Sequence, residues 1–202
     1  MSKIDFYIYA MHAVFWGAFG VTRLVLRSRD RHDVRAPETA AVPEGGEQEA
    51  PFSRALLGFH MLAFATMYFG IGNAVIPGRV PIWFAGQRIT GSLVIAMGAA
   101  LASAALACFR SWRFRAALDQ DHELATAGPF RVIRHPIYMG LNLLALGSAI
   151  WVPTPTMWTA VALMVIGGDL RARAEETLLE RVFGRAYVDY RARTRRFIPY
   201  TY

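Results

Sequence analysis

The chain has 202 residues, of which 54% are hydrophobic and 18% are charged, and its formal net charge is +7. A soluble domain is typically about a quarter charged, so this composition argues against a soluble protein. The single cysteine, Cys108, excludes an internal disulfide and a cysteine-based zinc cluster. The positive charge does not indicate nucleic-acid binding, because the arginines flank long apolar runs, as they do in membrane proteins.

The apolar runs predict membrane spans in chain order. The first, from about residue 4 to 26, lacks the cleavage site of a signal peptide, so we expect it to remain as a span. His12 within it is interpreted as a neutral side chain that hydrogen-bonds a neighbouring helix. Residues 27–51 are polar and have no apolar period, which predicts a flexible linker. Two further spans are predicted at about 52–76 and 89–109, the second rich in small residues that favour close helix packing.

Two shorter apolar runs follow at about 137–151 and 157–170, which predict a helical hairpin or a thin region of membrane. After Asp169 the pattern becomes amphipathic and charged, so we expect a C-terminal amphipathic helix, with Gly184 as a candidate break. The predicted fold class is therefore all-α, a polytopic integral membrane protein. It is expected to form one domain over residues 1–202, with about five transmembrane helices.

The basic residues predict an orientation in the bilayer. If the C-terminus of a five-span chain is cytoplasmic, all basic residues except Lys3, Arg79 and Arg88 lie in cytoplasmic segments. This bias favours an N-terminus outside and a C-terminus inside. The polar stretch before the fourth span and the C-terminal helix then share one face, and we expect them to form one site.

That polar stretch runs from His122 to Gly140 and ends at the fourth span. Arg134 and His135 stand at the apolar boundary, and Pro136 suits the first turn of a helix. The start of a helix also offers free N–H groups to an anion. We interpret this stretch as the wall of a small-molecule site on the cytoplasmic side.

A second polar cluster lies at residues 169–176, where Arg171 and Glu175 are four residues apart and share one helix face. On a soluble helix this would be a surface ion pair worth only a few tenths of a kcal/mol. At the end of a span, a polar pocket that reaches water is the better explanation, because unpartnered charges there are costly. No metal site is expected, since no cysteine cluster, His-x-x-x-His or carboxylate triad accompanies the histidines. No Gly-x-Gly-x-x-Gly motif indicates a Rossmann cofactor site.

Three ordered motifs are Gly128-Pro-Phe-Arg-x-x-Arg-His-Pro-x-Tyr-x-Gly140, Arg171-x-x-x-Glu-Glu176 and Phe183-Gly-x-x-Tyr187-x-x-Tyr190. Together they resemble the isoprenylcysteine carboxyl methyltransferase family and the wider group of membrane phospholipid methyltransferases. The resemblance covers residues 115–199, which it identifies as a cofactor-binding core. It implies an all-helical membrane enzyme that uses S-adenosylmethionine and releases S-adenosylhomocysteine.

The resemblance also implies roles for individual residues. The positions that match cofactor-binding residues of the family are His122, Glu123, Leu124, Ala125, Phe130, His135, Pro136, Ile137, Tyr138 and Glu175. Phe130 stands where the family often has tyrosine. Arg171 matches an arginine on the side of the methyl acceptor, and either Arg171 or Arg134 could hold a carboxylate acceptor by two hydrogen bonds.

The expected function is methyl transfer to a lipid-like or small apolar acceptor that enters from the bilayer. Carboxyl O-methylation of an isoprenylcysteine-type substrate is favoured over phospholipid N-methylation and small-thiol S-methylation. An amine or thiol acceptor would also need a proton acceptor, for which Glu175, Glu176 and Tyr138 are candidates. The remaining alternatives are an NADPH-dependent membrane reductase and a non-catalytic membrane scaffold.

Overall fold

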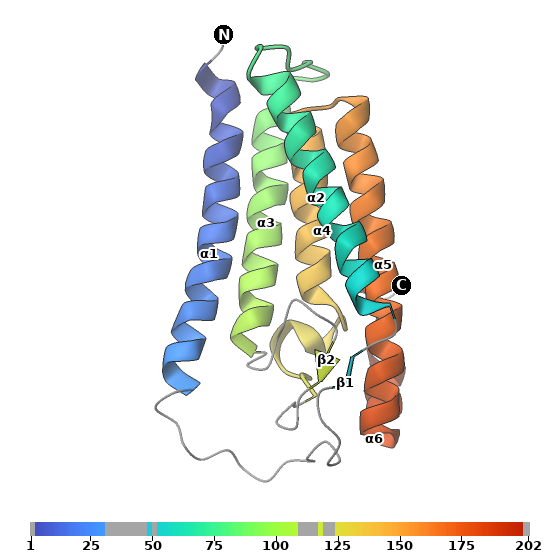
Figure 1. Ribbon diagram of the computed structural model, residues 1–202. Coiled ribbons are helices and arrows are strands. Elements are labelled where there is room, and N and C mark those ends of the chain that lie inside the picture. Colours follow the sequence, from blue (N-terminus) through green and yellow to red (C-terminus); the bar gives the residue numbers. More distant parts are fainter. Residues whose placement is uncertain (1–2, 31–47, 50–51, 109–116, 119–123, 200–202) are drawn as a thin grey trace.

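The computed structural model describes residues 3–30, 48–49, 52–108, 117–118 and 124–199. In this part of the chain the fold is a bundle of helices that run side by side (Figure 1). The elements are η1 (Lys3–Phe6), α1 (Tyr7–Asp30), β1 (Gln48–Glu49), α2 (Ser53–Val75), α3 (Gln87–Cys108), β2 (Ala117–Leu118), η2 (Gly128–Arg131), α4 (Pro136–Trp151), α5 (Pro155–Phe183) and α6 (Arg185–Arg193). The predicted all-α class is confirmed.

Three of these helices, α1, α2 and α3, are long and apolar enough to cross a membrane, and α4 is a shorter apolar helix. The 16 residues of α4 give a length of ~24 Å, less than the ~30 Å hydrocarbon core of a bilayer. The predicted fifth span and the amphipathic segment after it form one continuous helix, α5, of 29 residues. It ends at Gly184, whose φ of 51° favours glycine, so the break predicted there is confirmed.

The predicted linker at 27–51 is described only at its two ends. Residues 27–30 continue α1, and Gln48–Glu49 form β1, which pairs antiparallel with β2. Residues 31–47 and 50–51 lie outside the described residues. The strand pair joins the segment before α2 to the segment that follows α3.

Close backbone contact between α3 and α4 places the start of α4. A Cβ on Gly98 would lie 2.7 Å from the Gly140 carbonyl oxygen, and one on Gly147 would lie 2.7 Å from the Gly91 carbonyl oxygen. Only glycine permits this approach, and close packing of small residues is a main source of helix association in lipid. The predicted packing face on the third span is confirmed.

A polar network inside the bundle ties α1 to its neighbours. His12 Nε2 lies 2.8 Å from Ser148 Oγ of α4, and His12 Nδ1 lies 3.2 Å from the Tyr68 hydroxyl of α2. Trp16 Nε1 donates to the same Tyr68 hydroxyl at 2.7 Å. The interpretation of His12 as a residue bonded to neighbouring helices is confirmed.

Candidate active site

The segment that leads into α4 is a tight turn followed by η2. Gly128 has a φ of 57°, which favours glycine, and a Cβ on it would lie 2.5 Å from Cys108 Sγ, so the Cys108 side chain would have to move. Pro129 then occupies the first turn of η2. The Phe130 carbonyl accepts a hydrogen bond of 2.8 Å from the Tyr190 hydroxyl, which fastens η2 to α6.

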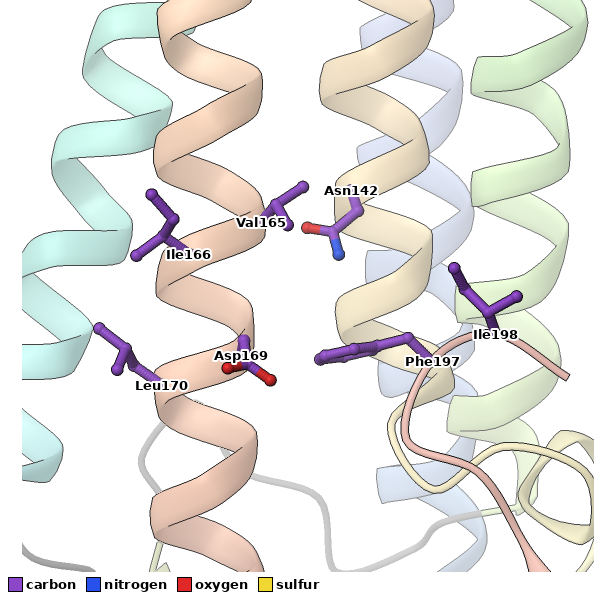
Figure 2. A pocket seen from close by; sticks show the side chains of 7 residues that line it. All are labelled: Asn142, Val165, Ile166, Asp169, Leu170, Phe197 and Ile198. Atoms are coloured by element: carbon purple, nitrogen blue, oxygen red, sulfur yellow. The ribbon is translucent and has the colours of Figure 1, made fainter. Parts of the chain in front are cut away.

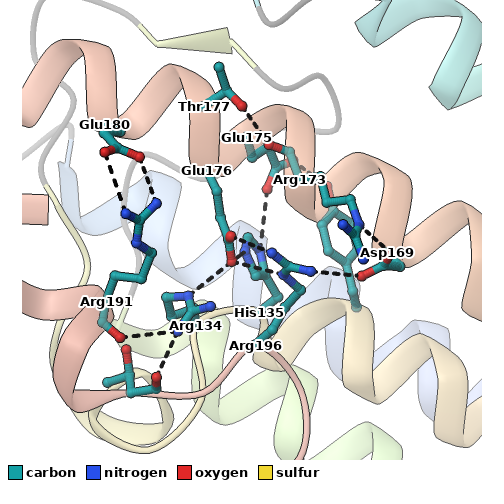
Figure 3. A network of polar contacts seen from close by, with 12 residues as sticks. Arg134, His135, Asp169, Arg173, Glu175, Glu176, Thr177, Glu180, Arg191 and Arg196 are labelled. Atoms are coloured by element: carbon teal, nitrogen blue, oxygen red, sulfur yellow. Dashed lines mark hydrogen bonds and ion pairs between the residues drawn. The ribbon is translucent and has the colours of Figure 1, made fainter. Parts of the chain in front are cut away.

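The C-terminal segment pairs with the residues just before α4. The Arg134 N–H donates to the Arg195 carbonyl at 2.7 Å, and the His135 N–H donates to the Arg196 carbonyl at 3.1 Å. The Arg195 N–H donates in turn to the Val132 carbonyl at 3.2 Å. This pairing holds the Arg196 side chain among the charges of α5, as Figure 3 shows.

Glu176 is the centre of the polar network, and the residue is only 5% exposed. Its Oε1 accepts from Arg134 Nε at 2.9 Å, and its Oε2 accepts from Arg196 Nη2 at 2.7 Å. His135 Nε2 lies 3.2 Å from Oε1. Burial alone would raise the pKa of the Glu176 carboxyl, but the hydrogen bonds from these three groups outweigh burial and hold that pKa well below its usual value. Glu176 is therefore an ionised anchor for both segments.

The adjacent Glu175 faces the start of α4. It accepts a hydrogen bond from the Tyr138 hydroxyl, and its Oε2 lies 3.6 Å from His135 Nδ1. Burial opposes ionisation, but the hydrogen bond and charge of His135 and the charge of Arg171 lower the pKa of the Glu175 carboxyl. Burial likewise disfavours the charged form of His135, yet the two carboxylates raise the pKa of its imidazole. His135 is therefore held towards its protonated form between two carboxylates.

Arg171 lies one turn before Glu175 on α5 and is 5% exposed. Its Cζ lies over the Tyr138 ring, 5.1 Å from the centroid, which is a cation–π contact. Two residues before Arg171 on α5, Asp169 accepts from Arg173 Nε at 2.6 Å and from Arg196 Nη1 at 3.1 Å. One face of α5 thus presents Arg171 and Glu175 to α4. Another face presents Asp169 and Glu176 to Arg196 of the C-terminal segment.

An apolar groove of about 420 Å³ adjoins this network (Figure 2). Its lining residues are Asn142, Val165, Ile166, Asp169, Leu170, Phe197 and Ile198. Asp169 also belongs to the polar network, and the Phe197 ring centroid lies 6.0 Å from that of His135. The groove therefore ends beside the ionised cluster, so apolar and charged surfaces meet at one place.

The structure brings together most of the predicted site. The predicted residues that meet at the cluster are Arg134, His135, Tyr138, Arg171 and Glu175. Pro136 and Ile137 are buried in the first turn of α4, beside His135. Phe130 is buried in η2, while Leu124 and Ala125 are half-buried before it. His122 and Glu123 lie outside the described residues.

Sequence reasoning placed Asp169 in the second polar cluster without a role, did not identify Arg196, and assigned Glu176 only a proton-accepting role. Asp169 and Glu176 are seven residues apart, two helical turns, and both bind Arg196. This spacing could have predicted a charged stripe on one face of α5. Arg196, which binds both carboxylates, lies in a C-terminal tail without an apolar period, so no pattern around it predicted the contact.

The chain is similar to known proteins in sequence and in fold. Residues 87–186 match the family described as phospholipid methyltransferase. The chain is 31% identical over 85 residues to protein-S-isoprenylcysteine O-methyltransferase B of Arabidopsis thaliana, covering 41% of this chain and 42% of that protein. It is 30% identical over 83 residues to a probable protein-S-isoprenylcysteine O-methyltransferase of Oryza sativa subsp. indica, covering 41% and 44%. The matched region thus spans less than half the length of these relatives.

The fold is similar to that of the eukaryotic intramembrane Ras methyltransferase, isoprenylcysteine carboxyl methyltransferase, with a TM-score of 0.59 at 19% identity. The likeness covers 99% of this chain and 69% of that one. The chain is accordingly a multi-pass integral membrane protein with the fold of intramembrane methyltransferases. The match over residues 87–186, just under half of the chain, places this part of the protein among the membrane methyltransferases of the phospholipid and isoprenylcysteine methyltransferase family.

Proposed function

We propose that this protein transfers a methyl group from S-adenosylmethionine to the carboxylate of a lipid-like acceptor of the isoprenylcysteine type. The observation that carries the proposal is the meeting of the apolar groove with the charged network, through Asp169, which binds Arg196, and through Phe197, which packs near His135. A substrate with an apolar chain and a charged head needs both surfaces at once. The curated relatives named for isoprenylcysteine methylation support the same acceptor class.

The residues at the start of α4 fit the chemistry of the cofactor. S-adenosylmethionine carries a carboxylate, an amino group and ribose hydroxyls, and it supplies an electrophilic methyl group on a sulfonium. The lowered pKa of Glu175 keeps an anionic acceptor available for its amino or hydroxyl groups. The N–H groups of Ile137 and Tyr138 lie in the first turn of α4, have no partner within the helix, and suit the carboxylate. His122, Glu123, Leu124, Ala125, Phe130, His135 and Pro136 complete the proposed pocket.

Arg171 is proposed to hold the acceptor carboxylate. Arg134, the other candidate, donates from Nε to Glu176 and from Nη1 to the Thr194 carbonyl at 2.7 Å, so we assign it to positioning. The S–CH₃ bond breaks as the O–CH₃ bond forms, and the positive and negative charges of the reactants cancel without transfer of a proton. Neutralisation is favoured where water is excluded, so alignment and enclosure by the protein provide most of the catalysis.

The site is proposed to face the cytoplasm. Arg134, Arg171 and Arg196 gather at the end of the bundle where α4 begins, whereas the turn between α2 and α3 lies at the other end (Figure 1). An excess of arginine near the ends of spans marks the cytoplasmic side. An acceptor anchored in the inner leaflet would then present its head at the level of the cluster.

A second function, phospholipid N-methylation, is favoured by one observation, the match of residues 87–186 to the phospholipid methyltransferase family. An amine acceptor must lose a proton, and the ionised Glu175 would be the nearest acceptor for it. The two functions differ in their products, a base-labile methyl ester and a stable methylamine.

The first experiment is calorimetric titration of the detergent-purified protein with S-adenosylhomocysteine, with NADPH as the control ligand. We expect micromolar binding of S-adenosylhomocysteine and none of NADPH.

Methyl-labelled S-adenosylmethionine is then supplied with a farnesylated cysteine or with phosphatidylethanolamine vesicles. Labelled methanol released by base from the farnesylcysteine product supports the proposal. Label confined to phospholipid supports N-methylation. NADPH binding alone supports a reductase, and folded protein that binds neither ligand supports a scaffold.

A further inference from the structure

An uncharged polar side chain, Asn142, lies in the wall of the apolar groove. It belongs to α4 and lines the groove together with apolar residues of α5 and the C-terminal segment, such as Val165 and Phe197 (Figure 2). Asn142 comes six residues after Pro136, or ~9 Å along the axis of a helix that is otherwise largely apolar. Polar side chains at membrane depth are rare because water does not reach them, and they usually mark a functional site.

The amide of Asn142 is not satisfied by the protein. Its Oδ1 is buried and has no hydrogen-bond partner in the described part of the chain. Other polar side chains of α4 are paired, because the Tyr138 hydroxyl donates to Glu175 and Ser148 Oγ donates to the Leu144 carbonyl at 2.7 Å. Burying an unpaired amide oxygen costs free energy that a leucine of similar size would avoid. The amide therefore points to a partner from outside the chain.

The groove gives this amide room to meet a ligand. Asn142 packs against Gly168 of α5, where an added Cβ would lie 3.6 Å from Oδ1 and 3.9 Å from Nδ2. Since residue 168 has no side chain and Oδ1 has no hydrogen bond, the amide is free to turn either atom towards the groove. The other polar lining residue, Asp169, is already bound by Arg173 and Arg196. Asn142 is therefore the polar lining residue that is available to a ligand.

The position of Asn142 fits the part of an acceptor where the apolar chain meets the polar head. It lies one helical turn beyond Tyr138, whose hydroxyl donates to Glu175, and thus between the charged network and the apolar part of the groove. In an isoprenylcysteine-type acceptor the sulfur carries the apolar chain, while the Cα carries both the methyl-accepting carboxylate and an amide nitrogen. A carboxamide has a carbonyl acceptor and N–H donors, so it can pair with both polar atoms of another amide.

We infer that Asn142 is a specificity residue whose side chain pairs with the amide next to the carboxylate of the acceptor. The inference rests on the proposed carboxyl methylation. Nδ2 donates to the amide carbonyl oxygen of the acceptor, and Oδ1 accepts from its amide N–H. Methyl transfer breaks the S–CH₃ bond and forms the O–CH₃ bond, so these hydrogen bonds act on binding of the acceptor and leave the chemical step unchanged. Acceptors without an amide therefore bind more weakly.

The test compares two acceptors that differ only in this amide, N-acetyl-S-farnesylcysteine and S-farnesylthiopropionate. Ester formation is measured on both, with the wild-type protein and with Asn142→Leu, which keeps the size of the side chain and removes both polar atoms. We expect the wild-type KM to be about fivefold lower for the N-acetyl acceptor, as a net gain of one neutral hydrogen bond would give. Asn142→Leu should abolish this preference by raising the KM of the N-acetyl acceptor alone, with the calorimetric affinity for S-adenosylhomocysteine unchanged.

A matched control is Val165→Ala, which removes apolar contact from the α5 wall of the same groove. It should raise the KM of both acceptors alike and keep the preference between them. Asn142→Ala, whose smaller side chain cannot obstruct the groove, should abolish the preference as Asn142→Leu does.

Equal KM values for the two acceptors in the wild-type protein, or a preference that survives in both Asn142 variants, would overturn the inference and leave the proposed function standing. A loss of S-adenosylhomocysteine affinity in both variants would show a structural role for Asn142 and also overturn the inference. Absence of ester from both acceptors with the wild-type protein overturns the proposed function, and the inference with it.

Discussion

Glu175 and Glu176 are adjacent in sequence but differ in what surrounds them. The side chain of Glu175 is 23% exposed, whereas that of Glu176 is 7% exposed. Glu176 is enclosed by donors from the protein, including both Arg134 and Arg196. Glu175 therefore has the free surface that a ligand needs, and Glu176 holds the scaffold together.

Glu175→Gln is expected to weaken cofactor binding while the fold is retained. The change removes the charge that a cationic ligand would meet, and a hydrogen bond to a charged group is worth about 1.5–3 kcal/mol. Affinity for S-adenosylhomocysteine should fall at least tenfold by calorimetry, and His135→Ala should act in the same direction. Glu180→Gln, which alters an outer ion pair with Arg191, is the control and should bind as the wild type does. Wild-type affinity in both site variants would exclude this cofactor assignment.

Arg171→Ala is expected to impair turnover more than cofactor affinity. Its guanidinium lies over Tyr138, and in the proposed function it holds the methyl acceptor. We predict at least a tenfold loss of kcat/KM for the acceptor, with an S-adenosylhomocysteine Kd within about threefold of wild type, below the loss of one charged hydrogen bond. Equal losses in both quantities would place Arg171 on the cofactor side instead.

The opposite pKa shifts of His135 and Glu176 predict how stability depends on pH. The raised pKa of His135 stabilises the fold below the ordinary histidine value of 6.5, and this contribution is lost as pH rises through the folded pKa. The lowered pKa of Glu176 stabilises the fold above 4.5, and this contribution is lost as pH falls through the folded pKa. The melting temperature should therefore be highest between these values. In His135→Phe the decline above pH 6.5 should flatten, and an unchanged profile would contradict the assignment.

The sequence motifs located Arg134, His135 and Glu175 because they fall within short, ordered stretches. The contact of Glu176 with Arg196 joins residues separated by a helix end, a glycine turn and α6. Such a contact depends on how the tail returns to the bundle, which no local pattern encodes.

At the scale of elements, apolar run length predicted α1, α2 and α3 closely, because a bilayer imposes a minimum length on a spanning helix, and the shorter run at 137–151 predicted the shorter helix α4. The continuity of α5 was not predicted, because its pattern changes from apolar to amphipathic near Asp169. No glycine or proline lies between Asp169 and Phe183, so nothing in the backbone stops the helix there. One rigid helix thus connects the membrane groove to the charged cluster.

Gly98→Ala tests the packing that places α4. The new Cβ would lie 2.7 Å from the Gly140 carbonyl oxygen, so the helices must separate. We expect a loss of about 1–3 kcal/mol in unfolding free energy and weaker cofactor binding, because His135 moves with α4. Gly58→Ala is the matched control, since a Cβ there meets nothing within 4 Å. It should be neutral or slightly stabilising in detergent melting experiments, and equal destabilisation by both variants would contradict the packing argument.

At the scale of the whole molecule, the candidate site forms because the start of α4 and the later part of α5 lie at the same end of the bundle. The two consecutive apolar runs predicted at 137–151 and 157–170 return the chain to the side where α4 begins, and the structure brings the start of α4 and the later part of α5 together there (Figure 1). Charge bias along the chain then predicts which side of the membrane this is. The groove was not predicted from the sequence, because its lining residues are apolar or isolated and form no local motif.

The orientation is tested by cysteine labelling in a Cys108→Ser background. Ile82→Cys lies between α2 and α3 and is predicted outside, whereas Ala186→Cys lies on α6 and is predicted in the cytoplasm. Both native residues are exposed, and neither substitution changes the charge bias that sets the topology. A membrane-impermeant maleimide applied to intact cells should label Cys at 82 and leave Cys at 186 unlabelled until the cells are opened. The reverse pattern would place the cluster outside and remove an inner-leaflet acceptor from the proposed function.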